Sequence, residues 1–419
     1  MTMKIRRSLG MMLTGAALLS LPACDSFLEV DNPNSLETES VDPERDARLL
    51  SQSAYQSFVN SYREIPVYAA WFTNHARVGD TFPTRNNFGR RQIPDNNTHT
   101  TGFWNNLHES LQFARTTIRS TEAAGPTVDL TRAWFVSGYA ILLQAELFCE
   151  GTIAESTLIS RGPMSTVALL DSAINDLRKV QELAAQVTGD GAAEAADLAM
   201  AAQVGIARAH LQAGRASEAA AAAASVPADY QYDLIHIDES SQRGLGSGVW
   251  SFTESRISLV VGPEFRAMAD SGDTRIAYVD AGRLSQDGVL QFYRQDKIKG
   301  WGDSDRFASG LEARYIIVEA NQNADAMLTF IQERRAAGNQ PPFPATTDMD
   351  VLMTELMVQR ARDFWLEGRD VADLRRNPQN APYVLQPGDN YYKPELGLVF
   401  DEVCWPVPLT EKERNLGWS

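Results

Sequence analysis

The chain has 419 residues, of which 44% are hydrophobic and 22% are charged, and its formal net charge is −16. Such an acidic composition argues against nucleic-acid binding and favours a soluble, monomeric protein. Three cysteines in this length exclude a disulfide-stapled scaffold.

The amino terminus has the pattern of an export signal. Three basic residues within positions 4–7 precede an apolar run over 9–21 that is too short to span a membrane. The run ends in the sequence LPAC, whose last residue is Cys24, and a cysteine in this place is what bacterial lipoprotein processing requires. We predict a cleaved signal over 1–23 and a lipid on Cys24, although Pro22 stands where a small residue is more usual. A cleaved signal followed by an ordinary buried cysteine is the alternative.

Cleavage changes the charge balance, and the mature chain begins with a polar segment. Removing 23 of the 419 residues, three of them basic and none acidic, leaves 396 residues and takes the formal charge from −16 to −19. Residues 24–41 are polar and turn-rich, which predicts a tether. Asp42 then has the pattern of an N-cap, with Pro43 at the first helical position. Apolar residues at a spacing of four extend this helix to about Tyr62.

Residues 63–103 lose the helical period. Apart from a short helix around Trp71, aromatic and amide side chains follow one another in what we predict to be a long loop. Long loops in compact domains are uncommon and often functional. An irregular surface excursion without function is the alternative.

From Phe103 the apolar residues return at helical spacing. They predict helices around 104–118, 135–147 and 170–177. The alanine-rich tract over 192–224, broken at Gly214, resembles a tetratricopeptide helix pair with small residues where the helices cross. A low-complexity alanine helix is the alternative, and we favour stacked helix pairs.

Residues 228–308 are rich in glycine and predict loops with short strands, and the helical period resumes at Leu311. The most charged helical stretch is 352–378, where Gly368 interrupts the apolar stripe. Its charges fit a solvated surface helix, ion pairs with neighbouring elements, or an arginine beside an active-site carboxylate. A proline-rich tail follows. Besides Cys24, the chain has Cys149 and Cys404, for which pairing and free thiols both stay open.

Two irregular segments combine aromatic rings with amide, carboxylate and guanidinium groups. A saccharide site needs this mixture, because sugar C–H faces pack on rings and sugar hydroxyls bond to polar side chains. The predicted ligand-binding residues are Phe82, Arg85, Asn86, Asn87, Tyr293, Arg294, Trp301 and Asp303. Trp301 is the first choice, because Gly300 and Gly302 beside it suit an exposed loop tip. The alternative is that Trp71 and Trp250 are core aromatics and that Phe82 caps a helix end.

Catalytic and cofactor motifs are missing from the sequence. It contains no G-x-S-x-G, no phosphate-binding loop and no dinucleotide fingerprint, and its five histidines show no metal-ligand spacing. We expect no enzyme, no metal and no cofactor. A two-carboxylate glycoside hydrolase and a tetratricopeptide-type interaction scaffold remain as alternatives.

Six motifs follow one another along nearly the whole chain. They are CDSFLEV at 24–30, WNNL at 104–107, the helix over 134–151 that ends in an aromatic-x-x-Gly pattern, LEARY through EA at 311–320, QRARDFWLEGRDVADLRR at 359–376, and CWPVP at 404–408. Taken in this order, they resemble the SusD/RagB family, surface lipoproteins that capture nutrients for a TonB-dependent outer-membrane transporter. Gln359 and Asp363 replace glutamates that are usual in the family pattern, and Val371 replaces an aromatic residue.

The resemblance implies a mainly α fold in which tetratricopeptide-like helix pairs form an α-superhelical body with a loop-rich ligand-binding face. The body would cover about 104–227 and 309–378, and the loop-rich segments about 63–103, 228–308 and 379–419, within a single domain over 42–419. The charges of 352–376 would then hold helices together.

The resemblance also implies a function. The protein would bind oligosaccharides or peptides at the cell surface and deliver them to a SusC-like TonB-dependent transporter. A palmitate-bearing Cys24 would anchor it in the outer membrane, and nucleic acid would not be a partner.

Overall fold

The computed structural model describes residues 42–156, 159–160 and 162–418. The predicted signal sequence, Cys24 and the tether lie outside the described residues. Residues Asp42–Ser419 form one unit by their contacts. Among the described helices, none is long and apolar enough to cross a membrane.

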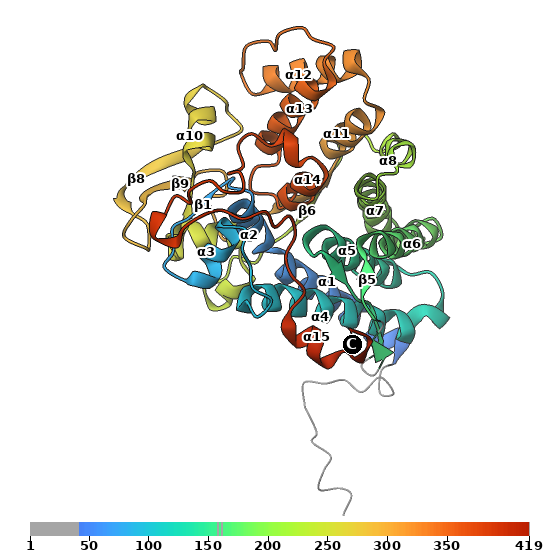
Figure 1. Cartoon of the computed structure of the whole chain (residues 1–419). Helices are drawn as coiled ribbons and strands as arrows, with labels where there is room; N and C mark the ends of the chain where they lie inside the picture. The colour runs from blue at the N-terminus through green and yellow to red at the C-terminus, as the bar shows by residue number, and fades with distance from the viewer. Residues whose placement is uncertain (1–41, 157–158, 161, 419) are drawn as a thin grey trace, which may run out of the picture. The chain divides into compact units, whose positions relative to one another are not determined.

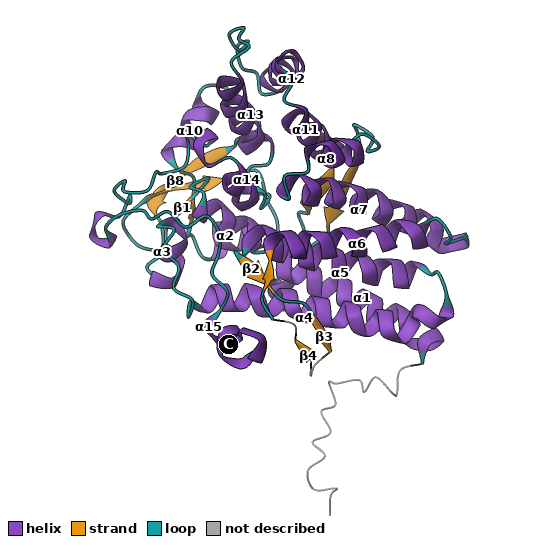
Figure 2. Cartoon of the chain, turned by 45° about the vertical axis from the view of Figure 1, so that its right-hand side comes forward, coloured by secondary structure: helices purple, strands orange, loops and turns teal. Residues whose placement is uncertain are grey.

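The helices of the amino-terminal half pack one on the next. They are α1 (Pro43–Tyr62), α4 (Thr98–Thr121), α5 (Val128–Leu147), α6 (Thr166–Ala184), α7 (Ala192–Gln212) and α8 (Ala216–Ala223). α1 packs on α4, α4 on α5, α5 on α6, α6 on α7 and α7 on α8 (Figure 1). Figure 2 shows α7, α6, α5 and α1 as neighbouring layers. The stacked helix pairs predicted from the sequence are therefore present.

Local sequence explains where these helices begin. The Asp42 carboxylate accepts from the backbone N–H of Arg45, and Asn97, Thr127 and Ser165 cap α4, α5 and α6 with side-chain oxygens. Each cap satisfies N–H groups that have no partner within the helix. α5 is buried along nearly its whole length and forms the centre of the stack.

The α7–α8 pair matches the predicted helical hairpin. Its turn contains Gly214 at φ +73°, a left-handed conformation that glycine adopts without strain. In α7, a side chain at Gly205 would collide with Leu177 and Tyr139, so the absence of one allows close packing.

A second helical group follows in the carboxy-terminal half: α11 (Gly310–Asn321), α12 (Ala324–Ala337), α13 (Met349–Asp363) and α14 (Asp370–Arg376). Tyr315, Phe330, Leu356 and Phe364 are buried together in its core. The stretch predicted as one interrupted helix is two helices. A turn containing Leu366 at φ +60° and Gly368 at φ +71° separates them.

Over the described residues, short antiparallel strands form one four-stranded sheet and three two-stranded pairs. β1 (Arg77–Val78), β7 (Leu259–Val260), β9 (Gln291–Gln295) and β8 (Tyr278–Leu284) form a four-stranded sheet in this order. Val260 pairs with Arg294, and Tyr278 pairs with Gln295. Three further pairs are β6 (Gln231–Leu234) with β10 (Asp305–Ser309), β2 (Glu150–Gly151) with β5 (Met164–Ser165), and β3 (Ala154–Ser156) with β4 (Ile159–Ser160).

The short helix predicted around Trp71 is confirmed as α2 (Ile65–Phe72), in which every residue is buried. The long loop predicted after it is partly wrong, because that segment contains α3 (Pro83–Gly89) and α4 already begins at Thr98. α3 is short and mostly polar, so it has no amphipathic period to detect. Trp71 is fully buried, which confirms the core alternative for this residue. The remaining short helices are α9 (Gly248–Trp250), the π-helix η6 (Ser251–Ser255), α10 (Pro263–Asp270) and α15 (Leu409–Arg414).

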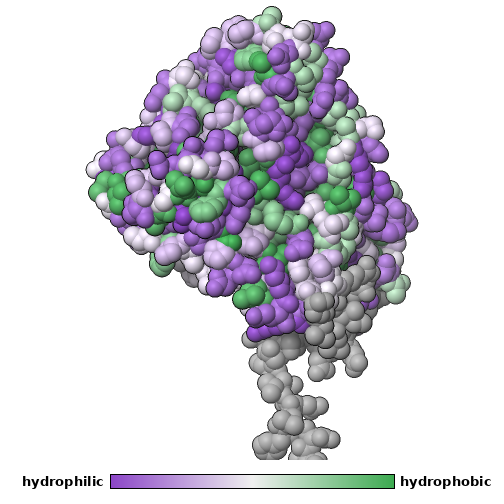
Figure 3. All heavy atoms as spheres, viewed as in Figure 1, coloured by the Kyte–Doolittle hydropathy of each residue, from purple (hydrophilic) through white to green (hydrophobic). Residues whose placement is uncertain are grey.

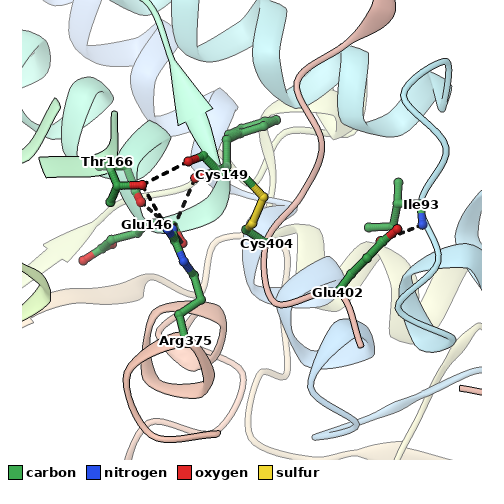
Figure 4. Close-up of a disulfide and its surroundings, with 9 residues drawn as sticks. Ile93, Glu146, Cys149, Thr166, Arg375, Glu402 and Cys404 are labelled. Carbon is green, nitrogen blue, oxygen red and sulfur yellow. Dashed lines mark hydrogen bonds between the residues drawn. A yellow bond between two sulfur atoms is a disulfide. The ribbon is translucent and has the colours of Figure 1, made fainter. Parts of the chain in front are cut away.

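The carboxy-terminal tail is fastened to the end of α5. Cys404 is disulfide-bonded to Cys149 (Figure 4). The Trp405 backbone N–H donates to the carbonyl of Leu147 at 2.7 Å. Trp405 is fully buried among Phe88, Phe103 and Phe148. Nearby, the Arg375 guanidinium donates to the carbonyls of Ala145, Glu146 and Phe148, which are acceptors left open at the helix end.

Most of the charges of 352–376 pair with other elements inside the protein. Glu367 is buried and forms ion pairs with Lys297 at 2.6 Å and Arg306 at 2.8 Å. Burial opposes the charge of Glu367, but these two cations outweigh it and hold the pKa of its carboxyl below the usual value. The interpretation of these charges as ties between elements is confirmed, and the interpretation as a solvated surface is wrong.

The exterior has mixed polarity. On the face drawn in Figure 3, hydrophobic residues form small groups among hydrophilic ones.

Candidate functional site

Trp301 lies in the connection between β9 and β10 and is half-buried. Its ring packs against Gly246, its carbonyl accepts from the Ser247 backbone N–H at 2.8 Å, and the Arg243 guanidinium carbon lies 4.8 Å from the ring centroid. The side chain is therefore held in place while part of it stays accessible, which is less exposure than the predicted loop tip implied.

Asp303 shapes the turn that carries Trp301. Its carboxylate accepts from the backbone N–H groups of Lys299 at 2.6 Å and Gly300 at 3.1 Å. These bonds occupy one carboxylate oxygen, so the structure gives Asp303 a supporting position beside Trp301.

Phe82 precedes α3 and is 54% exposed. The guanidinium carbon of Arg85 lies 4.9 Å from its ring centroid. Arg85 itself is buried and paired with the buried carboxylate of Asp80. The Phe82 ring is therefore exposed to solvent, and the buried Arg85 packs against it from the protein side.

The two asparagines of α3 differ in position. Asn86 is buried, donates to the carbonyls of Asp80 at 2.8 Å and Phe82 at 3.0 Å, and accepts from the Tyr391 hydroxyl. Its polar atoms serve the fold of the loop. Asn87 is half-buried, and its side chain makes no hydrogen bond to the residues that the structure describes.

A chain of contacts joins Trp301 to Phe82. The carbonyl of Gly246, which lies against Trp301, accepts from Arg63 at 2.8 Å, and Arg63 pairs with Glu64 at 2.9 Å. Glu64 lies 3.8 Å from Arg256, whose guanidinium carbon is 4.4 Å from the Phe252 ring centroid. The guanidinium carbon of Arg85 is 5.1 Å from the same ring centroid, and Arg85 also contacts Phe82. We name this group the Trp301–Phe82 surface, and it comprises Phe82, Arg85, Phe252, Arg256, Glu64, Arg63, Arg243 and Trp301.

The backbone at Gly248 lies close to the backbone at Arg63, and this approach brings two distant segments of the chain together at the surface. A side chain at Gly248 would lie 2.0 Å from the carbonyl oxygen of Arg63, so a residue with a Cβ does not fit there. Gly248 begins α9, and α9 continues into η6, which carries Phe252. The glycine thereby brings this helix against the junction of α1 and α2.

Tyr293 and Arg294 are neighbours in β9 and therefore point to opposite faces of the strand. Arg294 lies 4.0 Å from Glu254 of η6, close to the Trp301–Phe82 surface. Tyr293 instead packs against Arg266 at 3.7 Å and against Tyr278. No ring contact joins Tyr293 to Trp301 among the residues described, so the structure separates two members of the predicted group.

The arrangement resembles solved structures of one fold. The chain superposes on a SusD-like carbohydrate binding protein from Bacteroides vulgatus with a TM-score of 0.63 and 15% identity, over 82% of this chain and 86% of that chain. For a SusD superfamily protein from Bacteroides thetaiotaomicron the TM-score is 0.65 and the identity 14%, over 90% and 99%. The chain has the SusD-like fold. This result confirms the predicted fold class, mainly α with tetratricopeptide-like helix pairs.

A third structure with the SusD-like fold was solved with a sugar bound. Surface glycan-binding protein A from Bacteroides thetaiotaomicron, in complex with laminarihexaose, superposes with a TM-score of 0.62 and 12% identity, over 90% of this chain and 98% of that chain. No protein-family model matches the sequence, and no curated protein matches it either.

The arginines of the Trp301–Phe82 surface affect the pKa of the nearby residue His99. Its Nδ1 lies 2.9 Å from the Tyr68 hydroxyl, and burial together with the positive charges of Arg85 and Arg256 lowers the pKa of His99 to about 4. His99 is therefore neutral near pH 7, and arginines supply the positive charge here.

Sequence reasoning missed three arginines of this surface, Arg63, Arg243 and Arg256. Each is an isolated arginine in a segment without a regular period, and only the fold brings the three together. One signal was present, since Phe252 and Arg256 are four residues apart, the spacing at which side chains on a helical turn meet.

A hollow lies between α1 and α4. It is lined by side chains that are mostly uncharged and polar: Ser53, Gln56, Ser57, Asn60, Ser61, Asn106, Glu109 and Phe113. Phe113 is 41% exposed at this hollow. In the described part of the chain, no three His, Cys, Asp or Glu side chains gather as metal ligands.

Proposed function

We propose that the chain belongs to the SusD/RagB family and captures oligosaccharides at the cell surface for a partner TonB-dependent outer-membrane transporter. It would bind the sugar without cleaving it. The observation that carries this proposal is the Trp301–Phe82 surface on a SusD-like fold, where the rings of Trp301 and Phe82 and the guanidinium groups of Arg243 and Arg256 are at least partly exposed. Two proteins with this fold support the choice of ligand, since one is a carbohydrate binding protein and the other was solved in complex with laminarihexaose.

The chemistry of the surface suits a sugar. Trp301 and Phe82 offer partly exposed aromatic faces, on which the C–H groups of a pyranose ring can pack. Arg243 is an exposed donor beside Trp301, Arg256 is an exposed donor over the Phe252 ring, and Glu64 is an acceptor 3.8 Å from Arg256. Because the rings are held by packing and ion pairs, little conformational freedom is lost when a ligand binds.

Binding by the purified mature protein tests the proposal. Calorimetric titration with laminarihexaose, a panel of other oligosaccharides and a set of short peptides would identify the ligand class. We expect an oligosaccharide to bind and Trp301→Ala to weaken it about tenfold, the upper range for one aromatic contact. Phe113→Ala, which removes an exposed ring at the α1–α4 hollow, serves as the matched control and should leave the affinity unchanged. Binding of peptides alone would contradict an oligosaccharide ligand.

The lipid anchor has its own test, since Cys24 lies outside the described residues. The basic segment, apolar run and LPAC sequence support lipidation. Cys24→Ser should abolish labelling by palmitate and move the protein from the membrane fraction to the soluble fraction. A variant that stays in the membrane without label would require a second anchor.

The proposal of a transporter partner rests on the family resemblance and on the fold. Stable complexes of this kind bury interfaces on the order of several thousand Å². Affinity purification in mild detergent should therefore recover a large membrane protein together with this chain. Repeated recovery of the chain alone, while an unrelated complex of the same membrane stays intact, would contradict the partnership.

A further inference from the structure

Arg256 differs from the other arginines of the Trp301–Phe82 surface in having unused donors. Its side chain is 40% exposed, and its closest carboxylate is Glu64 at 3.8 Å, beyond hydrogen-bond distance. Within the described residues its guanidinium makes no hydrogen bond. It packs over the Phe252 ring at 4.4 Å, which holds the group without occupying its N–H edge.

The neighbouring guanidinium groups already have partners. Arg63 donates to the Gly246 carbonyl and pairs with Glu64, Arg85 is buried against Asp80, and Arg243 pairs with Asp238 at 2.7 Å. Arg63 and Arg85 bond to Glu64 and Asp80, the two carboxylates of the chain of contacts between Trp301 and Phe82. Three guanidinium groups, Arg63, Arg85 and Arg256, therefore face two carboxylates, and one positive charge is left over.

The backbone around Arg256 is unusual on both sides. It follows the π-helix η6, and its own N–H donates to the Ser251 carbonyl five residues earlier, at 3.0 Å. Ile257 after it has φ +51°, a left-handed conformation that is costly for a β-branched residue. π-helical turns and strained residues are frequent at functional sites, where the surrounding structure maintains them for a purpose. Here they place an arginine at the surface.

Other charges around Arg256 do not cancel the surplus. Glu254 is half exposed and lies 4.0 Å from Arg294, which is also 3.8 Å from Asp296, and Asp296 pairs with Lys299 at 3.1 Å. The two carboxylates and two cations of this group offset each other. Burial is the main reason that the pKa of His99 is lowered, and the positive charges of Arg85 and Arg256 act in the same direction, while Asp80 acts against them.

We propose that this surface takes acidic oligosaccharides, and that Arg256 binds a uronate carboxylate or a sulfate group while Trp301 and Phe82 contact the sugar rings. A planar guanidinium can give two parallel hydrogen bonds to such an anion. The proposal rests on the proposed function, because it names the class of sugar for the same site.

The test compares acidic oligosaccharides with their neutral counterparts. Uronate-containing oligosaccharides and their carboxyl-reduced forms, and sulfated oligosaccharides and their desulfated forms, are titrated into the mature protein by calorimetry. We expect at least one acidic member to bind about tenfold more tightly than its neutral form, as one charged hydrogen-bonded contact predicts. The arm that shows the difference identifies the carboxylate or the sulfate as the group bound.

Variants assign the effect to Arg256. Arg256→Gln should remove the preference, Arg256→Lys should keep part of it, and Arg48→Gln, an exposed arginine on α1, should change nothing. Raising the salt concentration should weaken the acidic ligand more than the neutral one. Equal binding of acidic and neutral forms, or a preference that survives Arg256→Gln, would overturn the inference and leave the proposed function intact. If no oligosaccharide binds, both fail.

Discussion

Cys149, which follows α5, is disulfide-bonded to Cys404 in the tail, and the bond joins positions 255 residues apart. Beside it, Trp405 fills the space between Phe88, Phe103 and Phe148. The tail is thus part of the core that supports α3 and the Phe82 loop.

Removing this disulfide should destabilise the protein. We expect the double variant Cys149→Ser/Cys404→Ser to lose about 3–5 kcal/mol of unfolding free energy, because the bond closes a long loop and restricts the unfolded chain. Denaturant unfolding of the variant and of the parent measures the loss. The parent unfolded in reducing buffer is the control and should match the variant. An unchanged midpoint would mean that the packing of Trp405 holds the tail alone.

Stability should also depend on pH through Glu402. Its carboxylate accepts from the Ile93 backbone N–H at 2.8 Å (Figure 4), and burial raises the pKa of Glu402 from 4.5 to about 7. A raised pKa means that the folded state favours the protonated form, so this contribution to stability is present below about pH 4.5 and is lost as pH rises through 7. Glu402→Gln should therefore raise the melting temperature relative to the parent at pH 8, with a smaller difference at pH 5. A difference that does not change with pH would contradict the shift.

Glu367 should matter for folding and not for ligand binding. Glu367→Ala leaves Lys297 and Arg306 without their shared carboxylate and should cost roughly 3 kcal/mol, the lower end for a buried pair because both cations are partly exposed. Glu395→Ala, at an exposed glutamate, is the control and should change stability by less than about 0.5 kcal/mol. Any Glu367→Ala protein that folds should bind sugar like the parent. Lost binding at unchanged stability would place Glu367 in the site.

Substitutions of Phe82 and of Arg85 should have different effects on stability and on ligand affinity. Phe82→Ala removes an exposed ring, so we expect a stability change within about 0.5 kcal/mol and an affinity about fivefold lower. Arg85→Ala strands the buried carboxylate of Asp80 and should cost about 3 kcal/mol. Thermal melting and calorimetry on both variants give the comparison. A destabilised Phe82→Ala protein would show that the ring belongs to the core.

Helices with a clear apolar period were predictable from the sequence. The helices around 104–118 and 135–147 appear within α4 and α5, because one repeated spacing decides which side faces the core. α3 (Pro83–Gly89) was missed, because a helix of seven mostly polar residues has no such period. The pairing of Cys149 with Cys404 depends on which distant segments meet, and spacing along the chain carries no information about that.

The candidate site was only partly predictable. Phe82 and Trp301 have the expected accessible rings, but Asn86 and Arg85 turn their polar groups inward to Asp80 and its neighbours. A polar, irregular segment has the same composition whether its side chains bind a ligand or each other. The spacing of Phe252 and Arg256 could have indicated their contact, but the importance of Arg256 comes from its distance to a carboxylate of another segment, which the sequence does not give.

A crystal structure of the mature protein with a bound oligosaccharide tests the central claim most directly. The account predicts sugar density against Trp301 and Phe82, with a sugar oxygen or anionic group within hydrogen-bond distance of the Arg256 guanidinium. Density in the hollow between α1 and α4, with the Trp301–Phe82 surface free of ligand, would contradict the account.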